Sequence, residues 1–134
     1  MTRKLNCVML IDDNEDDNFY HKMIIREVDL ADQVEVAETG FEALNILKSE
    51  IHTPELIFLD INMPAMNGWE FLEEYKKLND GQKAEIIIIM LTTSLNPLDK
   101  KRAEQIPEIS GFETKPLTPE MLKRIFDQFF SRAE

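Results

Sequence analysis

The sequence predicts an α/β fold, a doubly wound, five-stranded parallel sheet with five helices. Three observations lead to this prediction. Short apolar runs of strand length alternate along the chain with longer segments whose apolar residues recur at helical spacing. The runs that begin at Leu5 and Leu56 are almost wholly apolar, which indicates strands buried on both faces. Regular alternation of strands and helices is typical of a parallel sheet that helices cover on both sides.

The first predicted strand covers Leu5–Ile11, and two acids, Asp12 and Asp13, follow it directly. Glu15–Asp17 is expected to be the solvated first turn of a helix, because acids stabilise a helix N-terminus. Helical spacing in the next residues marks that helix, through Phe19, Tyr20, Met23, Ile24 and Val28.

A short second strand is expected at Val34 and Val36, which alternate with polar residues, so that one of its faces is less buried. Thr39–Gly40 then turns the chain into a helix with an apolar set of its own, Phe41, Leu44 and Leu47.

The third strand begins at Leu56 and ends abruptly at the carboxylate of Asp60. Pro64 prevents its ladder from continuing, and a new helical pattern opens at Gly68. That helix is expected to end at Asn79–Gly81, and its apolar stripe is expected to lie in the core, through Trp69, Leu72, Tyr75 and Leu78.

The most hydrophobic run, Glu85–Leu91, predicts a central strand, and the hydroxyl of Thr92 follows it. Asn96–Pro97 begins a polar fourth helix whose weak amphipathic pattern predicts loose packing and mobility. The last strand is expected over Ile109–Thr114, and Lys115–Pro116 follows it. A final helix starts at Thr118–Pro119 and has one apolar face, made by Met121, Leu122, Ile125, Phe126 and Phe129.

Composition restricts the classes of function. The 134 residues are expected to form one domain, and their net charge of −11 argues against binding to nucleic acid or to an anionic membrane surface. The single cysteine, Cys7, excludes an intrachain disulfide and a cysteine-rich metal site. His21 and His52 lack the spacing of metal ligands and are expected to be solvated. No stretch is long enough to span a bilayer, so a soluble, cytoplasmic protein is expected.

Polar residues at the strand ends carry the functional prediction. Right-handed crossovers place the C-terminal ends of parallel strands at one edge of the sheet. Five polar residues are therefore expected to converge there, namely Asp12, Asp13, Asp60, Thr92 and Lys115. Close carboxylates repel each other unless a cation joins them, and Mg²⁺ prefers such an all-oxygen site. The hydroxyl and the ammonium suit a bound anion, and one carboxylate is suited to attack phosphorus. Taken alone, Asp60 fits a helix-capping role equally well.

In this order and on these elements, the residues resemble the receiver domain of two-component response regulators, of the single-domain, chemotaxis-protein type. The resemblance covers essentially the whole chain. It is carried by Asp12–Asp13, by Asp60 with Met63–Pro64 and Gly68, by Thr92, and by Lys115–Pro116. It implies a flavodoxin-like sheet with strand order 2-1-3-4-5, and one receiver domain over residues 1–134 without an output domain.

The resemblance also implies roles for individual residues. Asp60 would be the phosphoacceptor. Asp13 and Asp60 would bind Mg²⁺ directly, Asp12 would bind it through water, and Asn62 would bind it through its backbone carbonyl.

The resemblance also implies which residues bind the phosphoryl group and which residue changes its orientation when that group is bound. Thr92 would hydrogen-bond the phosphoryl group, and Lys115 would pair with it. Phe112 matches the aromatic residue that rotates inward when Thr92 is drawn to the phosphate. The expected partners are a sensor histidine kinase or phosphotransfer protein, and a downstream protein that contacts the face formed by the fourth helix, the fifth strand and the fifth helix.

The chain departs from the family pattern at three places. Thr93 stands where the family usually has a small Ala or Ser, so tighter access to the site is expected. Pro107–Ser110 replaces the usual Gly- and Ala-rich approach to the fifth strand, which bears on the fourth helix and the output face. Phe112 replaces the usual Tyr and lacks the hydroxyl that could report the state of the switch to a partner.

Two other classes of function fit the fold. A Mg²⁺-dependent aspartyl-phosphate phosphohydrolase would use Asp60 as nucleophile, but enzymes of this kind want an acid two residues later, where this chain has Asn62. A flavodoxin-like cofactor binder would want a glycine- or hydroxyl-rich phosphate loop after the first strand. This chain places Asp12 and Asp13 there, and their charges repel phosphate.

Overall fold

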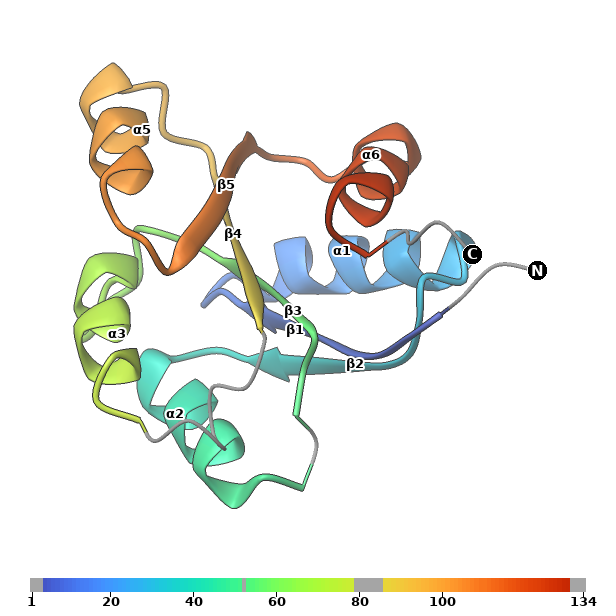
Figure 1. Cartoon of the computed structure of the whole chain (residues 1–134), viewed down its shortest axis with the longest axis horizontal. Helices are drawn as coiled ribbons and strands as arrows, with labels where there is room; N and C mark the ends of the chain where they lie inside the picture. The colour runs from blue at the N-terminus through green and yellow to red at the C-terminus, as the bar shows by residue number, and fades with distance from the viewer. Residues whose placement is uncertain (1–3, 52, 79–85, 131–134) are drawn as a thin grey trace.

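The structure is a computed structural model that describes residues 4–51, 53–78 and 86–130. Strands and helices alternate along the chain, with the labels of Figure 1. In order they are β1 (Leu5–Ile11), α1 (Glu15–Glu27), β2 (Ala31–Ala37), α2 (Gly40–Ser49), β3 (Leu56–Leu59), α3 (Gly68–Tyr75), β4 (Ile87–Thr92), α5 (Pro97–Glu104), β5 (Ile109–Thr114) and α6 (Pro119–Phe129).

The described strands form one five-stranded sheet in the order β2-β1-β3-β4-β5, and every pair is parallel. The predicted fold class and strand order are therefore confirmed. The register aligns the strand ends, because Ile11 of β1 lies opposite Leu59 of β3, and Thr92 of β4 lies opposite Thr114 of β5. The residues that follow these strands consequently meet at one edge of the sheet.

Helices cover both faces of the sheet (Figure 1). One core layer joins the sheet to α2, α3 and a single residue of α5, Ala103. The other joins the opposite face to α1 and α6. The expected Trp69, Leu72 and Tyr75 stripe lies in the first layer, and Cys7 is buried as the sequence predicts. Within the described part of the chain, no helix has the length and apolar character needed to cross a bilayer.

Helix α1 corrects two predictions. Phe19, in the apolar set that marks this helix in the sequence, is 74% exposed. The buried side of α1 instead begins with polar Asn18 and His21 and continues with Ile24 and Ile25. The prediction that His21 is solvated is thus wrong, because this part of α1 lies over the sheet, where His21 lines a small internal cavity with Leu10, Phe58 and Leu91. His52 lies outside the described residues.

Helix α3 ends at Tyr75, earlier than predicted, and Asn79–Gly81 lies outside the described residues. Helix α5 packs as loosely as its sequence predicts, since Ala103 alone of its eight residues is buried. Helix α5 also makes a cation–π interaction with α3, in which the Arg102 guanidinium carbon lies 4.3 Å from the centre of a Trp69 ring.

Candidate functional site

The predicted acidic cluster forms at the C-terminal edge of the sheet. Asp12 and Asp13 follow β1, Asp60 follows β3, and one carboxylate oxygen of each lies within 4.8 Å of the others. Asp12 and Asp60 are only 5% and 7% exposed, whereas Asp13 is exposed. Two buried carboxylates beside a third create a strongly negative recess that needs a cation.

The backbone fixes the position of Asp60. Its N–H donates to the Ile11 carbonyl at 3.0 Å, which extends the pairing of β1 and β3 past the strand end. The helix that follows starts very close, because Gly68 donates to the Ile61 carbonyl at 2.8 Å. A Cβ at position 68 would lie 2.5 Å from the Asp60 carbonyl oxygen. Glycine is therefore required where α3 begins against the strand that carries Asp60.

The electrostatic environment of Asp60 is unfavourable to its charged form. Burial, reinforced by the nearby charge of Asp12, raises the pKa of Asp60 to about 6. Lys115 acts in the opposite direction but does not cancel the effect. The carboxyl is ionised at neutral pH at a cost in stability, which is a common property of functional groups.

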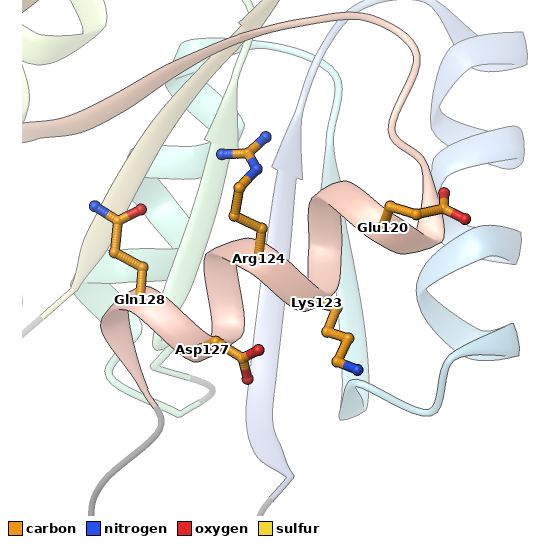
Figure 2. Close-up of a pocket in the computed structure, with 5 residues that line it drawn as sticks. All are labelled: Glu120, Lys123, Arg124, Asp127 and Gln128. Carbon is orange, nitrogen blue, oxygen red and sulfur yellow. The ribbon is translucent and has the colours of Figure 1, made fainter.

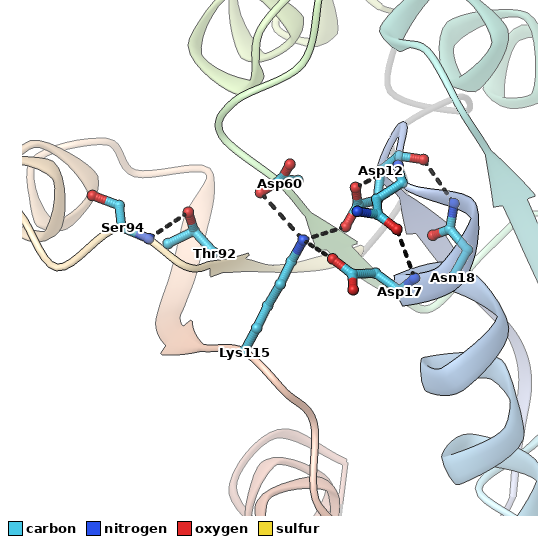
Figure 3. A network of polar contacts seen from close by, with 8 residues as sticks. Asp12, Asp17, Asn18, Asp60, Thr92, Ser94 and Lys115 are labelled. Carbon is cyan, nitrogen blue, oxygen red and sulfur yellow. Dashed lines mark hydrogen bonds and ion pairs between the residues drawn. The ribbon is translucent and has the colours of Figure 1, made fainter.

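Lys115 lies at the centre of the polar network (Figure 3). Its Nζ is 2.6 Å from Asp12 Oδ2, 2.8 Å from Asp17 Oδ2 and 3.7 Å from Asp60 Oδ1. Burial would lower the pKa of Lys115, but hydrogen bonds to Asp12 and Asp17 outweigh it and raise that pKa. The ammonium therefore stays charged beside the acidic cluster.

Beneath the cluster, α1 contributes a buried polar layer. Asn18 Nδ2 donates to the Asp12 carbonyl at 2.7 Å, while Asn18 Oδ1 is buried without a partner among the described residues. His21 is 2% exposed, and burial, followed by the charge of Lys115, lowers its pKa. Asn18, His21 and Asp60 line a cavity of about 10 Å³, a size that holds a single water.

Thr92 is fully buried at the end of β4 and connects the edge of the sheet to α5. Its hydroxyl accepts the Ser94 N–H at 3.1 Å, and its carbonyl accepts the Lys115 N–H at 2.9 Å. Ser94 Oγ in turn donates to Asp99 Oδ2 of α5 at 2.6 Å. A displacement of Thr92 would thus reach the start of α5 through two consecutive hydrogen bonds.

The remaining predicted residues lie around the cluster rather than in it. Asn62 follows Asp60 by two residues, and its side chain is exposed. Phe112 lies on β5, half-buried against the core layer that contains α3. Thr93 is exposed beside Thr92.

The structure adds residues that the sequence prediction missed. Asp17 was predicted to be simply solvated, but it forms an ion pair with Lys115, so that prediction is wrong. Asn18 and His21 form the inner face of α1 near the cluster. The signal available in the sequence is their spacing to Ile24 and Ile25, which places all four on one side of a helix.

The cluster fits Mg²⁺. Its donors are hard carboxylate oxygens, which Mg²⁺ prefers, and one oxygen from each of the three acids lies within 4.8 Å of the others. A second depression, along α6, lacks these properties (Figure 2). It is lined by exposed side chains from that one helix, in which acids and bases are mixed, namely Glu120, Lys123, Arg124, Asp127 and Gln128.

Comparisons with known proteins place this chain among proteins of two-component signalling. A family model described as the response regulator receiver domain matches residues 8–127. The chemotaxis protein CheY of Halobacterium salinarum is 30% identical over 122 residues, which are 90% of this chain and 93% of that protein. The sensor histidine kinase CheAY of Helicobacter pylori is 27% identical over 88% of this chain, which spans 14% of the kinase.

Solved structures agree with this relationship. The crystal structure of a two-component response regulator from Cytophaga hutchinsonii is 32% identical, with a TM-score of 0.86, and the match covers 94% of this chain and 97% of that one. The fold, the acidic edge and these similarities lead to one conclusion. This chain belongs to the response regulator receiver domains, the phosphorylation-dependent signalling domains of two-component systems.

Proposed function

We propose that Asp60 accepts a phosphoryl group from the phosphohistidine of a sensor histidine kinase or phosphotransfer protein, and that the phosphorylated domain signals by noncovalent contact. The observation that carries this proposal is the setting of Asp60. It is a buried carboxylate at a strand end, with two other acids within 4.8 Å and the Lys115 ammonium 3.7 Å away. The proposed exchange takes place in the cytoplasm.

The transfer needs no proton from the nucleophile. With a pKa of about 6, Asp60 is ionised at neutral pH, and a lone pair on its carboxylate oxygen attacks phosphorus. As the new O–P bond forms, the P–N bond of the phosphohistidine breaks, and its electron pair stays on the imidazole nitrogen. The product is an aspartyl phosphate and a neutral histidine when the donor ring starts protonated.

Mg²⁺ fits the acidic cluster and would supply positive charge to the phosphoryl oxygens and the carboxylates. We propose Asp13 and Asp60 as its direct ligands, Asp12 as a ligand through water, and Asn62 as a ligand through its backbone carbonyl. The buried position of Asp12 and the exposed position of Asp13 support different roles for these two acids.

We propose that two residues at the ends of neighbouring strands, Thr92 and Lys115, hold the phosphoryl group. The Thr92 hydroxyl accepts a hydrogen bond from Ser94, which leaves its own proton available for a phosphoryl oxygen. Lys115 supplies a buried positive charge, and an ammonium is a suitable point charge for phosphate.

The same contacts support a switch. When Thr92 moves toward the phosphoryl group, its hydrogen bond to Ser94 is strained, and Ser94 is bound to α5. Helix α5 has one buried residue, so its displacement costs little. Phe112, half-buried on β5, is proposed to turn inward at the same time. The output surface would be the α5–β5–α6 face, which is the fourth-helix, fifth-strand, fifth-helix face of the sequence prediction.

Relatives support the choice of partners. One similar protein is named a chemotaxis protein, and another is a sensor histidine kinase. We therefore propose a histidine kinase as the phosphoryl donor. The net charge of −11 favours a protein, rather than nucleic acid, as the target.

The test is direct phosphorylation. Wild type and Asp60→Asn are incubated with acetyl phosphate and Mg²⁺, and the intact proteins are weighed. Wild type should gain one phosphoryl group, and Asp60→Asn and metal-free wild type should gain none. Equal labelling of both proteins, or an unlabelled wild type, would refute the assignment. Continuous release of phosphate from many simple esters would instead indicate a phosphohydrolase.

A further inference from the structure

The ammonium of Lys115 has more acidic partners than the phosphoryl chemistry requires. An ammonium has three N–H donors. Two of them are directed to Asp12 and Asp17, at 2.6 and 2.8 Å, while Asp60 lies 3.7 Å away, beyond hydrogen-bonding distance. The group that should serve the phosphoryl site is therefore bound more closely by α1 than by the phosphoacceptor.

We propose that Asp17 is a positioning residue that holds Lys115 toward α1 in the unphosphorylated protein and thereby opposes formation of the phosphorylated state. This inference rests on the proposed function of Asp60. It concerns the competition for one ammonium between a carboxylate of α1 and the phosphoryl group.

The first turn of α1 is built to hold Asp17 in place. The Asp17 N–H donates to Oδ1 of Asn14, the N-cap residue, at 3.0 Å. Asn14 in turn donates its N–H to Asp12 Oδ1 at 3.0 Å, and Asn18 donates to the Asp12 carbonyl. These bonds tie the turn to the end of β1, so the Asp17 carboxylate is directed at Lys115 by fixed backbone (Figure 3).

Exposure decides which acid gives up Lys115 when a phosphoryl group arrives. The Asp12 side chain is 7% exposed, and a buried carboxylate that loses its cation suffers a large desolvation cost. The Asp17 side chain is 36% exposed and can be solvated instead. Lys115 should therefore release Asp17 and keep Asp12.

Neutralising Asp17 should have opposite effects on the binding of the phosphoryl anion and on the binding of Mg²⁺. Asp17→Asn removes a competitor for Lys115 and also a negative charge that repels the phosphoryl group, so both effects favour the bound anion. The same loss of charge should weaken Mg²⁺ binding, because Asp17 attracts the cation without belonging to the three-acid cluster.

The experiment measures two binding affinities. The affinity for beryllofluoride, a stand-in for the phosphoryl group, is measured by ¹⁹F NMR at saturating Mg²⁺, and the affinity for Mg²⁺ alone is measured by calorimetry. Asp17→Asn should bind beryllofluoride about two- to fivefold more tightly, as expected for a partly exposed ion pair. Its affinity for Mg²⁺ should fall by less than about tenfold. Asp16→Asn is the matched control, since Asp16 is an exposed acid of the same turn. Asp17→Glu, which keeps the charge, should behave like wild type.

Each other outcome overturns the inference. Unchanged beryllofluoride affinity in Asp17→Asn, with only a lower melting temperature, would leave Asp17 a helix-stabilising acid. Loss of Mg²⁺ binding by far more than tenfold would make it a metal ligand, and an equal gain in Asp16→Asn or Asp17→Glu would remove Lys115 from the explanation. If wild type binds beryllofluoride, the proposed function stands in all these cases. A wild type that neither binds it nor accepts a phosphoryl group overturns both proposals.

Discussion

Replacing Asp60 by Asn should stabilise the metal-free protein at neutral pH. Burial and the charge of Asp12 raise the pKa of Asp60 from 3.8 to about 6, with the opposing effect of Lys115 already included. One pKa unit corresponds to about 1.36 kcal/mol, so holding Asp60 ionised in the folded protein costs about 3 kcal/mol. The amide of Asn has nearly the same shape and carries no charge, so the variant avoids this cost.

The stability gained by replacing Asp60 with Asn should depend on pH, and the sign of this dependence follows from the pKa shift. Because the folded-state pKa lies above the unfolded-state pKa, the folded protein binds more protons between about pH 4 and pH 6. The contribution of Asp60 to stability therefore falls as the pH rises through this window. The difference between Asp60→Asn and wild type should be near zero below pH 4, increase up to pH 6, and stay constant at about 3 kcal/mol above it.

Urea unfolding of both proteins at pH 4, 5, 6, 7 and 8, with a chelator present, measures this difference. Asp16→Asn, which removes an exposed acid, should change the free energy of unfolding by no more than about 0.5 kcal/mol. Adding Mg²⁺ should stabilise wild type and not Asp60→Asn, because only the folded wild type presents all three carboxylates. A variant less stable than wild type at pH 7, or a difference independent of pH, would refute the electrostatic reasoning.

Three further predictions follow from the site. Asp13→Asn should raise the stability of the metal-free protein by about 1 kcal/mol and abolish the response to millimolar Mg²⁺, which thermal melts with chelator and with metal would measure. Gly68→Ala should cost about 1–3 kcal/mol in urea unfolding, since its Cβ would meet the Asp60 carbonyl oxygen; a neutral result would mean that α3 shifts freely. Thr92→Ala should still be phosphorylated, but amide NMR shifts around Asn96 and Phe112 on adding beryllofluoride should disappear. Retained shifts there would show that Thr92 does not carry the switch.

The parts of this molecule that follow from simple periodicity could be predicted from the sequence. The bounds of β1 and β5 match the prediction. For β1 the reason is that an apolar run ended by charges leaves little freedom in where the strand stops. The convergence of Asp12, Asp13 and Asp60 also follows, since parallel strands place their C-terminal ends together.

Contacts between side chains of different elements could not be predicted in the same way. Nothing in the acidic run Glu15–Asp17 distinguishes the one acid that reaches Lys115, because the choice depends on how α1 is rotated about its axis over the sheet. The apolar pattern of the sequence does not give this rotation. In the first turns of α1, exposed apolar residues such as Phe19 and Met23 outnumber buried apolar ones. An apolar count therefore selects the wrong side of this helix.

The rotation of α1 has a physical cause that also links the site to the stability of the helix. Its second half lies over the apolar sheet, where Ile24 and Ile25 enter the core layer shared with α6. Its first half lies over the strand ends, where Asn18 and His21 line a cavity together with Asp12, Asp60 and apolar side chains of β1, β3 and β4, so that polar side chains are buried there. The N-terminal half of α1 is thus held in part by polar contacts, among them the hydrogen bond from Asn18 to the Asp12 carbonyl and the ion pair between Asp17 and Lys115. A change of charge at Asp60 should therefore alter the forces on this helix, because Asp60 lies 3.7 Å from the Lys115 ammonium to which Asp17 of α1 is bound.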